Sequence, residues 1–100
     1  MASSKEYLEF VLEQLSDLEG ITHRAMMGEY IIYYKGKVIG GVYDDRFLIK
    51  ITKSAKELMP DAPLELPYEG AKPMLSADVD DRELLYRLIP KVADELPNKK

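Results

Sequence analysis

The chain has 100 residues, 46% of them hydrophobic, with no cysteine and a formal net charge of −4. This length fits one domain with a modest core, and the sequence lacks the long apolar run that a membrane-spanning helix requires. The absence of cysteine excludes disulfides, thiolate metal sites and cysteine nucleophiles, and the negative charge opposes non-specific binding to polyanions.

The first predicted element is a helix over residues 4–18. Ser3 followed by Glu6 has the spacing of a capping box, in which both side chains bond to free N–H groups of the first turn. Gly20 can adopt the left-handed conformation that ends a helix. Apolar positions recur at steps of three and four residues, at Leu8, Val11, Leu12, Leu15 and Leu18.

The residues before the helix show no signal-peptide pattern, so we expect a cytoplasmic protein.

Three antiparallel strands are predicted next, over Glu29–Tyr34, Lys37–Tyr43 and Arg46–Ile51, where β-branched and aromatic residues gather. The intervening pairs Lys35-Gly36 and Asp44-Asp45 are short enough to form tight hairpins. Adjacent strands must therefore pair antiparallel. Gly40-Gly41 inside the second strand indicates a bulge, or a place where a large group packs against the strand.

A short helix is predicted after the strands, with Ser54 as its cap and an end near Met59, because Pro60 disfavours helical geometry in the residue before it. Residues 60–73 are rich in proline. They predict only short extended segments, around Leu64–Leu66 and Lys72–Ala77.

A closing helix is predicted to begin near Asp81, since Asp80 and Glu83 repeat the capping-box spacing ahead of an apolar periodic segment. Pro90 removes one backbone hydrogen bond inside that segment, so we expect a kink or a break there. Residues 97–100 are expected to form a frayed tail.

The predicted order is helix, three strands, helix, two strands, helix. An antiparallel sheet of about five strands with its helices on one face is the simplest arrangement that buries the apolar faces of all these elements. We therefore predict a single α+β domain with two layers over residues 1–100.

The sequence offers no convincing set of catalytic or metal-binding residues. His23 is its one histidine, and the spacing places no Ser or Asp partner beside it. Asp78, Asp80 and Asp81 lack the further ligands of a calcium loop and are better explained as helix caps. The glycines at 36, 40 and 41 lie in a hairpin and do not fit a phosphate loop. We expect a protein that is not an enzyme and that holds no metal or cofactor.

Successive side chains of a strand point to opposite faces of the sheet, and from Tyr30 to Tyr34 every residue is apolar or aromatic. We therefore expect neither face of this strand to be fully exposed to solvent. Helices cover one face only in a two-layer fold. The other face, presenting either Ile31 with Tyr33 or Tyr30 with Tyr34, is a candidate contact surface for a second copy or another protein. An equally good interpretation is that this face is partly solvated and binds nothing, with the tyrosine hydroxyl groups exposed to water.

Positive charge gathers in the middle of the chain. Residues 22–56 carry seven Lys or Arg and three acids, whereas residues 1–21 and residues 57–100 each have a net charge of −4. This pattern is typical of strands that keep their edges soluble, and it also fits a surface for an anionic partner. The candidate partner-binding residues are Arg24, Tyr30, Tyr33, Tyr34, Lys35, Lys37, Arg46 and Lys50.

Six segments of the sequence match a known family pattern: Arg24–Tyr30, Tyr34–Lys37, Gly40–Arg46, Leu48–Lys50, Pro67–Gly70 and Asp80–Leu84. On these segments the sequence resembles the N-terminal domain of the TfoX/Sxy family of bacterial competence regulators. The resemblance implies a helix, three strands, helix, two strands, helix arrangement like that of type III secretion chaperones. It also implies a non-enzymatic role in transcription regulation, in support of a CRP-like activator. The second, helical domain of the full-length regulators is expected to be absent.

A cytoplasmic regulatory domain that binds a protein partner, and that forms a homodimer, is therefore the leading hypothesis. Two alternatives stay open. One is a small-ligand binder or an unrecognised enzyme, with a pocket between helix and sheet near Tyr68. The other is direct DNA binding through residues 22–56.

Overall fold

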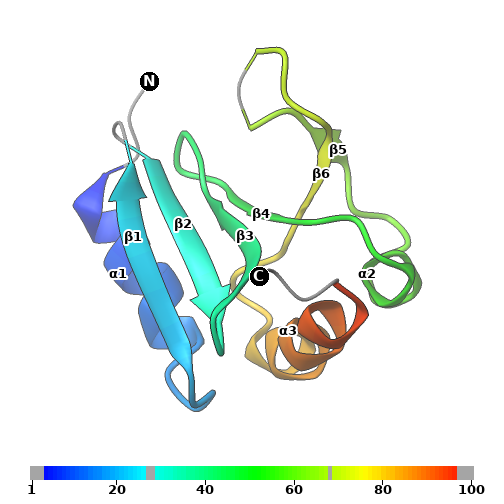
Figure 1. The fold of residues 1–100 in the computed structure, drawn as a ribbon, viewed down its shortest axis with the longest axis horizontal. Helices are drawn as coiled ribbons and strands as arrows, with labels where there is room; N and C mark the ends of the chain where they lie inside the picture. Colours follow the sequence, from blue (N-terminus) through cyan, green and yellow to red (C-terminus); the bar gives the residue numbers. More distant parts are fainter. Residues whose placement is uncertain (1–3, 27–28, 68, 97–100) are drawn as a thin grey trace.

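A computed structural model describes residues 4–26, 29–67 and 69–96 and shows one antiparallel sheet with three helices (Figure 1). The predicted α+β class is confirmed. The predicted frayed tail at residues 97–100 lies outside the described residues. In chain order the elements are α1 (Lys5–Gln14), β1 (Ile21–Met26), β2 (Glu29–Tyr34), β3 (Lys37–Val42), β4 (Phe47–Ile49), α2 (Lys53–Leu58), β5 (Leu64–Glu65), β6 (Met74–Ser76) and α3 (Arg82–Glu95).

The sheet has six strands, in the order β1-β2-β3-β4-β6-β5, and each neighbouring pair is antiparallel. Strand β1 is the addition to the roughly five predicted strands. It pairs with β2 along its whole length, from Ile21 opposite Tyr34 to Met26 opposite Glu29. Five of its six residues are exposed, because the strand lies at the edge of the sheet. The sequence therefore has no alternation of apolar and polar residues from which this strand could be predicted.

Both predicted hairpins are confirmed. Lys35 and Gly36 have φ values of 51° and 85°, and Asp44 and Asp45 have values of 54° and 56°. Positive φ at both central residues is the signature of the two-residue turn whose twist matches that of the flanking strands. These turns place β2, β3 and β4 next to one another.

The glycine pair in β3 marks both a bulge and a close contact, as predicted. The register shifts between Ile32 and Tyr33, which pair with Gly40 and Val38. A Cβ on Gly40 would lie 2.1 Å from the carbonyl oxygen of Leu48 in β4. At Gly41 it would lie 2.8 Å from the ring of Tyr43. Neither position accepts a side chain without local movement.

Helix α1 is shorter than predicted. It spans Lys5–Gln14, and its cap is Ser4, whose Oγ accepts the N–H of Tyr7 at 3.1 Å. Beyond Gln14 the chain makes tighter turns, such as the bond from the N–H of Leu18 to the carbonyl of Leu15. Leu15 stays fully buried, so the apolar period continues after the α-helix has ended. This tightening leads the chain through Gly20 (φ 93°) into β1.

The other two helices begin one or two residues away from the predicted caps. Thr52, rather than Ser54, caps α2 by accepting the N–H of Ala55 at 3.1 Å. Asp81, rather than Asp80, caps α3 by accepting the N–H of Leu84 at 3.0 Å. Several residues that can cap a helix lie close together at the start of α2 and of α3, so the sequence does not decide which of them is the cap.

Of the kink or break predicted at Pro90, the break is wrong, because α3 runs as one helix from Arg82 to Glu95. Proline costs a helix one hydrogen bond, but packing can outweigh that loss. Ile89, just before Pro90, and Val92, two residues after it, are both fully buried.

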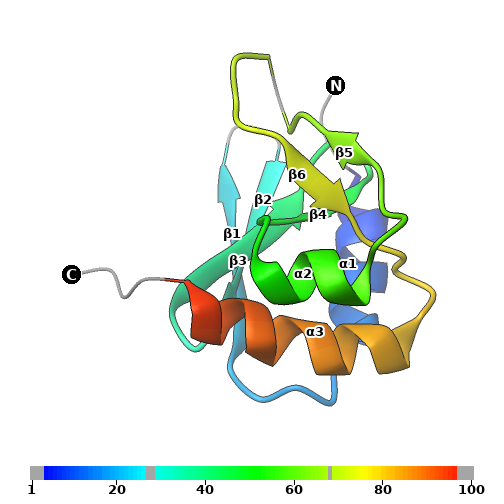
Figure 2. The ribbon, with the colours of Figure 1, turned by 90° about the vertical axis from the view of Figure 1, so that its right-hand side faces the viewer.

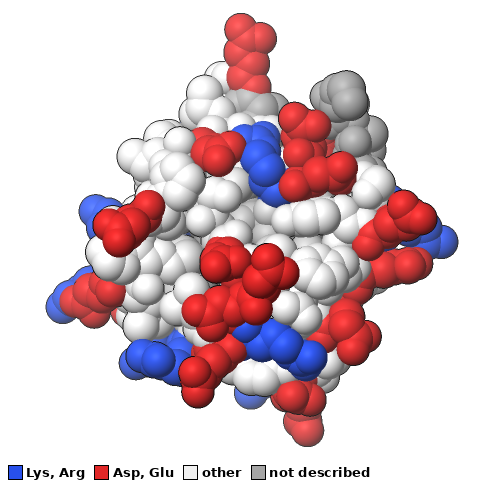
Figure 3. Space-filling model, turned by 180° about the vertical axis from the view of Figure 1, so that it is seen from behind, with Lys and Arg blue, Asp and Glu red and all other residues white. Residues whose placement is uncertain are grey.

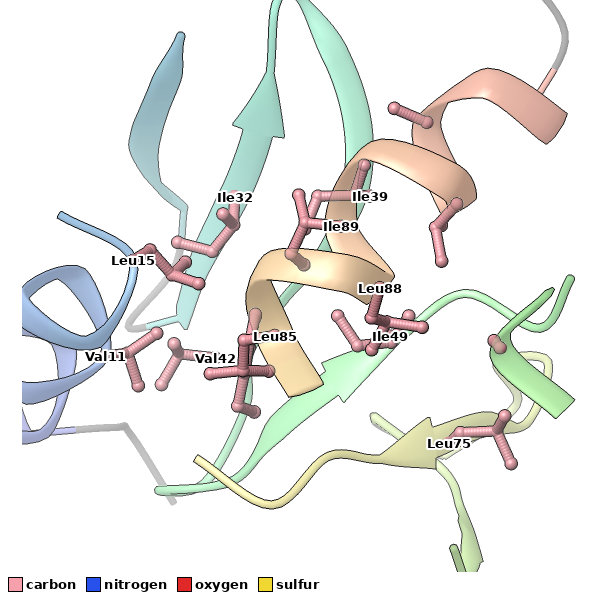
Figure 4. Packing of buried hydrophobic residues seen from close by; sticks show 14 of the residues in the cluster. Val11, Leu15, Ile32, Ile39, Val42, Ile49, Leu75, Leu85, Leu88 and Ile89 are labelled. Atoms are coloured by element: carbon pink, nitrogen blue, oxygen red, sulfur yellow. The ribbon is translucent and has the colours of Figure 1, made fainter. Parts of the chain in front are cut away.

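All three helices contribute to one hydrophobic core on one side of the sheet. Figure 4 shows Val11 of α1 and Leu15, just after its end, meeting Ile32 of the sheet, while Ile89 of α3 lies against Ile39. Helices α2 and α3 lie side by side in Figure 2. Ala55 of α2 belongs to the same hydrophobic cluster. The helices are therefore on one face, as predicted.

Candidate partner-binding surface

The two faces of β2 have different environments. Ile32 is fully buried in the core, and Tyr30 and Tyr34 pack against that core on the same side. Ile31 and Tyr33 alternate with them and therefore point to the other side, where both are half-buried. Of the two arrangements that the sequence left open, the structure selects the one that presents Ile31 with Tyr33.

Cross-strand pairing extends this surface onto both neighbouring strands, since directly opposed residues share a face. Arg24 of β1 is opposite Ile31, and Val38 of β3 is opposite Tyr33. Met26 alternates with Arg24 along β1 and is 47% exposed. We call the surface formed by Arg24, Met26, Ile31, Tyr33 and Val38 the open face. No described helix crosses in front of β1 and β2 in Figure 1, and α1 lies behind them.

The open face continues beyond Val38 into a hollow of about 630 Å³. Strand β3 and the segment after β4 form one wall, and residues near β6 form the other. Tyr43, which lines the hollow, and Leu48 of β4 are both buried, yet neither belongs to the core on the helix side. The second side of the sheet is thus covered at the β4–β6 end and open at the β1–β2 end.

Two of the basic candidate residues, Lys37 and Arg46, bond to other parts of the same chain. The Nζ of Lys37 donates to the carbonyl of Ala93 at 2.9 Å, at the end of α3. Arg46 donates from Nε to the carbonyl of Tyr43 and pairs through its guanidinium with Glu65. Both side chains therefore have structural partners.

The remaining candidates lie in three places. Tyr30 is on the helix side, where its ring meets the exposed His23 edge-on at 6.4 Å between centroids. Lys35 lies in the β2–β3 turn, with its Nζ 5.4 Å from the centre of the Tyr34 ring. Lys50 lines the hollow. Of the eight candidates, the open face brings together Arg24 and Tyr33.

The basic middle of the sequence does not form one patch on the open face. Lys53 and Lys56 belong to α2, and Lys37 reaches toward the end of α3. The helix side carries acids instead, since Glu6, Glu9 and Glu13 of α1 are exposed. Figure 3, which looks at the molecule from behind, shows Asp and Glu over much of that face.

Titratable groups with shifted pKa values lie away from the open face. Burial, reinforced by Asp45, raises the pKa of Tyr7. Hydrogen bonds from the Ser54 hydroxyl and N–H hold the pKa of Glu95 below its usual range. This carboxylate is therefore a weaker base than an ordinary one.

Neither a metal-binding cluster nor a membrane-spanning helix occurs within residues 4–26, 29–67 and 69–96. No three His, Cys, Asp or Glu side chains in these ranges are grouped to hold a metal ion. Within the same ranges, none of the helices has the length and apolar character needed to cross a bilayer. Asp81 and Asp78, considered above as metal ligands, bond to backbone N–H groups instead.

Met26 and Val38 belong to the open face but were not among the predicted site residues. The sequence did contain a signal for Val38, because hairpin geometry around Lys35-Gly36 sets it near Tyr33. Met26 had no such signal, since it depends on β1 being a strand.

Two comparisons with known proteins match nearly the whole chain. A family model described as the TfoX N-terminal domain matches residues 13–96. A protein of Spirochaeta aurantia described as an uncharacterized 12.7 kDa protein in the trpE 5′ region is 32% identical over 102 aligned residues. That alignment covers 100% of this chain and 89% of the relative.

Proposed function

Because the chain belongs to the TfoX N-terminal domain family, we propose that it is a non-catalytic regulatory domain that binds a partner protein through its open face. The partner class that the family resemblance favours is a transcription activator. The sequence supports a role without catalysis, since it has a single histidine and no cysteine.

One observation carries the proposal: Ile31 and Tyr33 point away from the core that the helices fill, next to an exposed Met26. Apolar area removed from water contributes about 25 cal/mol per Å², so covering this surface with another protein is favourable. Tyrosine and arginine, here Tyr33 and Arg24, are the residue types most often found at the centre of such contacts.

The test is a pull-down with purified protein as bait and native lysate as prey, read by mass spectrometry. We expect Tyr33→Ser to reduce capture of the specific partner roughly tenfold, as loss of a central aromatic contact typically does. Phe10→Ser is the matched control, because Phe10 is an exposed aromatic residue on α1, behind the sheet. Equal losses in the two variants, or none in either, would contradict the proposal.

The same variants separate this function from its competitors. Light scattering of the purified protein distinguishes a homodimer through the open face, whose mass would halve in Tyr33→Ser alone. Direct DNA binding predicts an affinity that falls steeply with added salt and that depends on Lys53 and Lys56. A partner complex through the open face predicts no dependence on those two lysines.

A further inference from the structure

Strand β1 stands first in the sheet order, and no described strand pairs with its outer side. The N–H of Lys35 donates to the carbonyl of Gly20 at 2.8 Å, which extends the register of β1 with β2 by one pair. Residues of an antiparallel strand alternate between bonding to the neighbouring strand and facing away from it. Every second residue counted from Gly20 therefore bonds toward β2. The residues between them, whose N–H and C=O groups face outward, are Ile21, His23 and Ala25.

The two edges of the sheet differ in their protection against pairing with another chain. Strand β5 at the far edge has two residues, and it lies between Pro63 and Pro67. Short length, proline, lysine and bulges are the features that keep an edge from accepting a further strand. Strand β1 has six residues without proline or lysine, and its register with β2 has no shift. Of the two edges, β1 is therefore the one suited to strand addition.

The space beyond β1 is open on both sides of the sheet. Thr22 and Arg24 are exposed on the side of the open face. His23 is opposite the buried Ile32 and so lies on the helix side with Ala25, yet both of these are exposed too. An added strand would lie about 4.8 Å beyond β1. The exposure of these four side chains indicates that no described element occupies that place.

Arg24 determines the charge of this edge. It is the one Lys or Arg residue of β1, and within the described ranges no ion pair or hydrogen bond engages its guanidinium. A residue directly opposite it in an added strand would have its Cβ about 4.5–5.5 Å away, where an opposite charge is favourable and a like charge is not. Met26, two residues along on the same face, is 47% exposed. The edge therefore fits a segment with an acid and, two positions away, an apolar residue.

A second copy of the chain fits this edge less well than a single extended segment does. Helix α1 lies behind β1 in Figure 1, and its Glu6, Glu9 and Glu13 are exposed. Two copies joined antiparallel through β1 would bring both α1 helices to the same side of the joined sheet, where their acids repel each other. An extended segment brings no helix and meets no such repulsion.

We propose that β1 accepts an extended segment of the partner protein as an additional strand, with an acidic side chain opposite Arg24 and an apolar one beside Met26. Strand addition takes its affinity from backbone hydrogen bonds and its specificity from alternate side chains. The inference rests on the proposed function, because it specifies how the partner of the open face is held.

The test is an NMR titration of the isotope-labelled chain with the peptide acetyl-Thr-Val-Thr-Glu-Thr-Val-Thr-amide. A valine lies two positions from the glutamate on either side, so the pattern is the same for parallel and antiparallel binding. We expect saturable amide shifts at Ile21, His23 and Ala25, with a dissociation constant on the order of 1 mM for so short a segment. Shifts that do not saturate, or that map away from β1, would overturn the proposal.

Charge reversal tests the role of Arg24 without removing any backbone group. A matched peptide with lysine in place of glutamate should bind the parent chain roughly fivefold more weakly, and Arg24→Glu should reverse this preference. Arg87→Glu, at an exposed position of α3, is the control and should keep the preference of the parent. An unchanged preference in Arg24→Glu would refute the pairing with an acid.

Ala25→Pro tests the backbone contact. It removes an N–H that faces outward and is not needed for pairing with β2, and proline is tolerated at such edge positions. Amide shifts in β2 should change little, whereas the peptide should bind at least roughly tenfold more weakly because a hydrogen bond is lost and the ring obstructs pairing. Peptide affinity that survives this change would contradict strand addition.

The pull-down variants separate this inference from the proposed function. Loss of capture in Tyr33→Ser but not in Ala25→Pro would leave the open face as the contact and refute strand addition. Loss in Ala25→Pro alone, together with peptide binding at β1, would support strand addition and refute the contact through Tyr33. A doubled mass in light scattering that halves in Ala25→Pro would assign the edge to a second copy and overturn the proposal.

Discussion

The Nζ of Lys37 donates a 2.9 Å hydrogen bond to the carbonyl oxygen of Ala93, a residue 56 positions further along the chain. A longer contact of 3.4 Å joins the same Nζ to the carbonyl of Leu96. The last carbonyls of a helix have no partner within it, and a cation there also meets the negative end of the helix dipole. Lys37 thus ties β3 to the end of α3.

Replacing Lys37 by Met should therefore lower the free energy of unfolding by about 1–2 kcal/mol. Urea denaturation followed by circular dichroism measures it. The control is Lys35→Met in the same turn, where the ammonium lies over the Tyr34 ring at an exposed site and the change should be below about 0.5 kcal/mol. Equal effects at the two lysines would show that the α3 contact contributes nothing.

Arg46 is expected to be sensitive even to lysine. Its guanidinium pairs with Glu65, donates to the carbonyl of Leu66 at 3.2 Å, and uses Nε for the carbonyl of Tyr43. Lysine cannot reproduce this planar fork, so Arg46→Lys should cost about 2 kcal/mol of stability. Arg87→Lys, at an exposed position of α3, is the control and should be neutral. An Arg46→Lys variant as stable as the parent would refute this role.

Two glycines should respond to alanine in different degrees. Gly40→Ala forces a Cβ to 2.1 Å from the carbonyl oxygen of Leu48, a backbone atom that cannot rotate away, and should cost about 3 kcal/mol. Gly36→Ala meets nothing within 4 Å and pays only for its φ of 85°, about 1 kcal/mol. Thermal unfolding of both variants gives the comparison. A smaller loss at Gly40 than at Gly36 would contradict the close approach of β3 and β4.

The two faces of β2 should differ in their contribution to stability. Ile32→Ala leaves a cavity in the core and should cost about 3 kcal/mol, whereas Ile31→Ala on the open face should cost about 1 kcal/mol. Denaturation of each variant in guanidinium measures the difference. The reverse order would mean that the helices cover the other face of the strand.

The Glu95 carboxylate predicts a pH dependence of stability. Its pKa is lowered in the folded protein by hydrogen bonds from the hydroxyl and the N–H of Ser54. A depressed folded pKa adds stability above the unfolded pKa of about 4.3, and that contribution is lost as pH falls through the folded pKa. Glu95→Ala should thus be less stable than the parent at pH 7, with the gap closing below about pH 4.

The matched control for this titration is Glu57→Ala, which removes an exposed glutamate from α2. Its stability at pH 7 should match that of the parent, because the side chain lies at an exposed position. A gap for Glu95→Ala that stays constant from pH 7 to pH 3 would show that the Ser54 contact does not depend on charge.

Local chemistry made the hairpins and the core faces of the helices predictable. Lys35-Gly36 and Asp44-Asp45 turn the chain within two residues, so β2, β3 and β4 needed no distant contact to be placed. The helix starts were predicted less well, because Ser54 and Asp80 are as good caps as the residues used, Thr52 and Asp81. Strand β1 was not predicted, because its residues are mostly exposed and so do not alternate between apolar and polar types.

The candidate site was predicted only in part. The sequence showed that β2 has two apolar faces, and the structure added that Tyr33 lies on the open one. In the sequence, Lys37 and Arg46 could not be distinguished from Arg24, because all three are basic residues of the positively charged segment 22–56. Their hydrogen bonds to Ala93 and Leu66 depend on segments brought together only by folding.

The sequence by itself determined the α+β class, the order of every element except β1, and the turns, because these follow from periodicity and backbone preferences over a few residues. Only the tertiary structure decided which side of β2 the helices cover, which cations are left to face outward, and where the hollow lies. Those outcomes depend on contacts between residues far apart in the chain, and no local pattern of side chains encodes which distant group will satisfy a given donor or cover a given face.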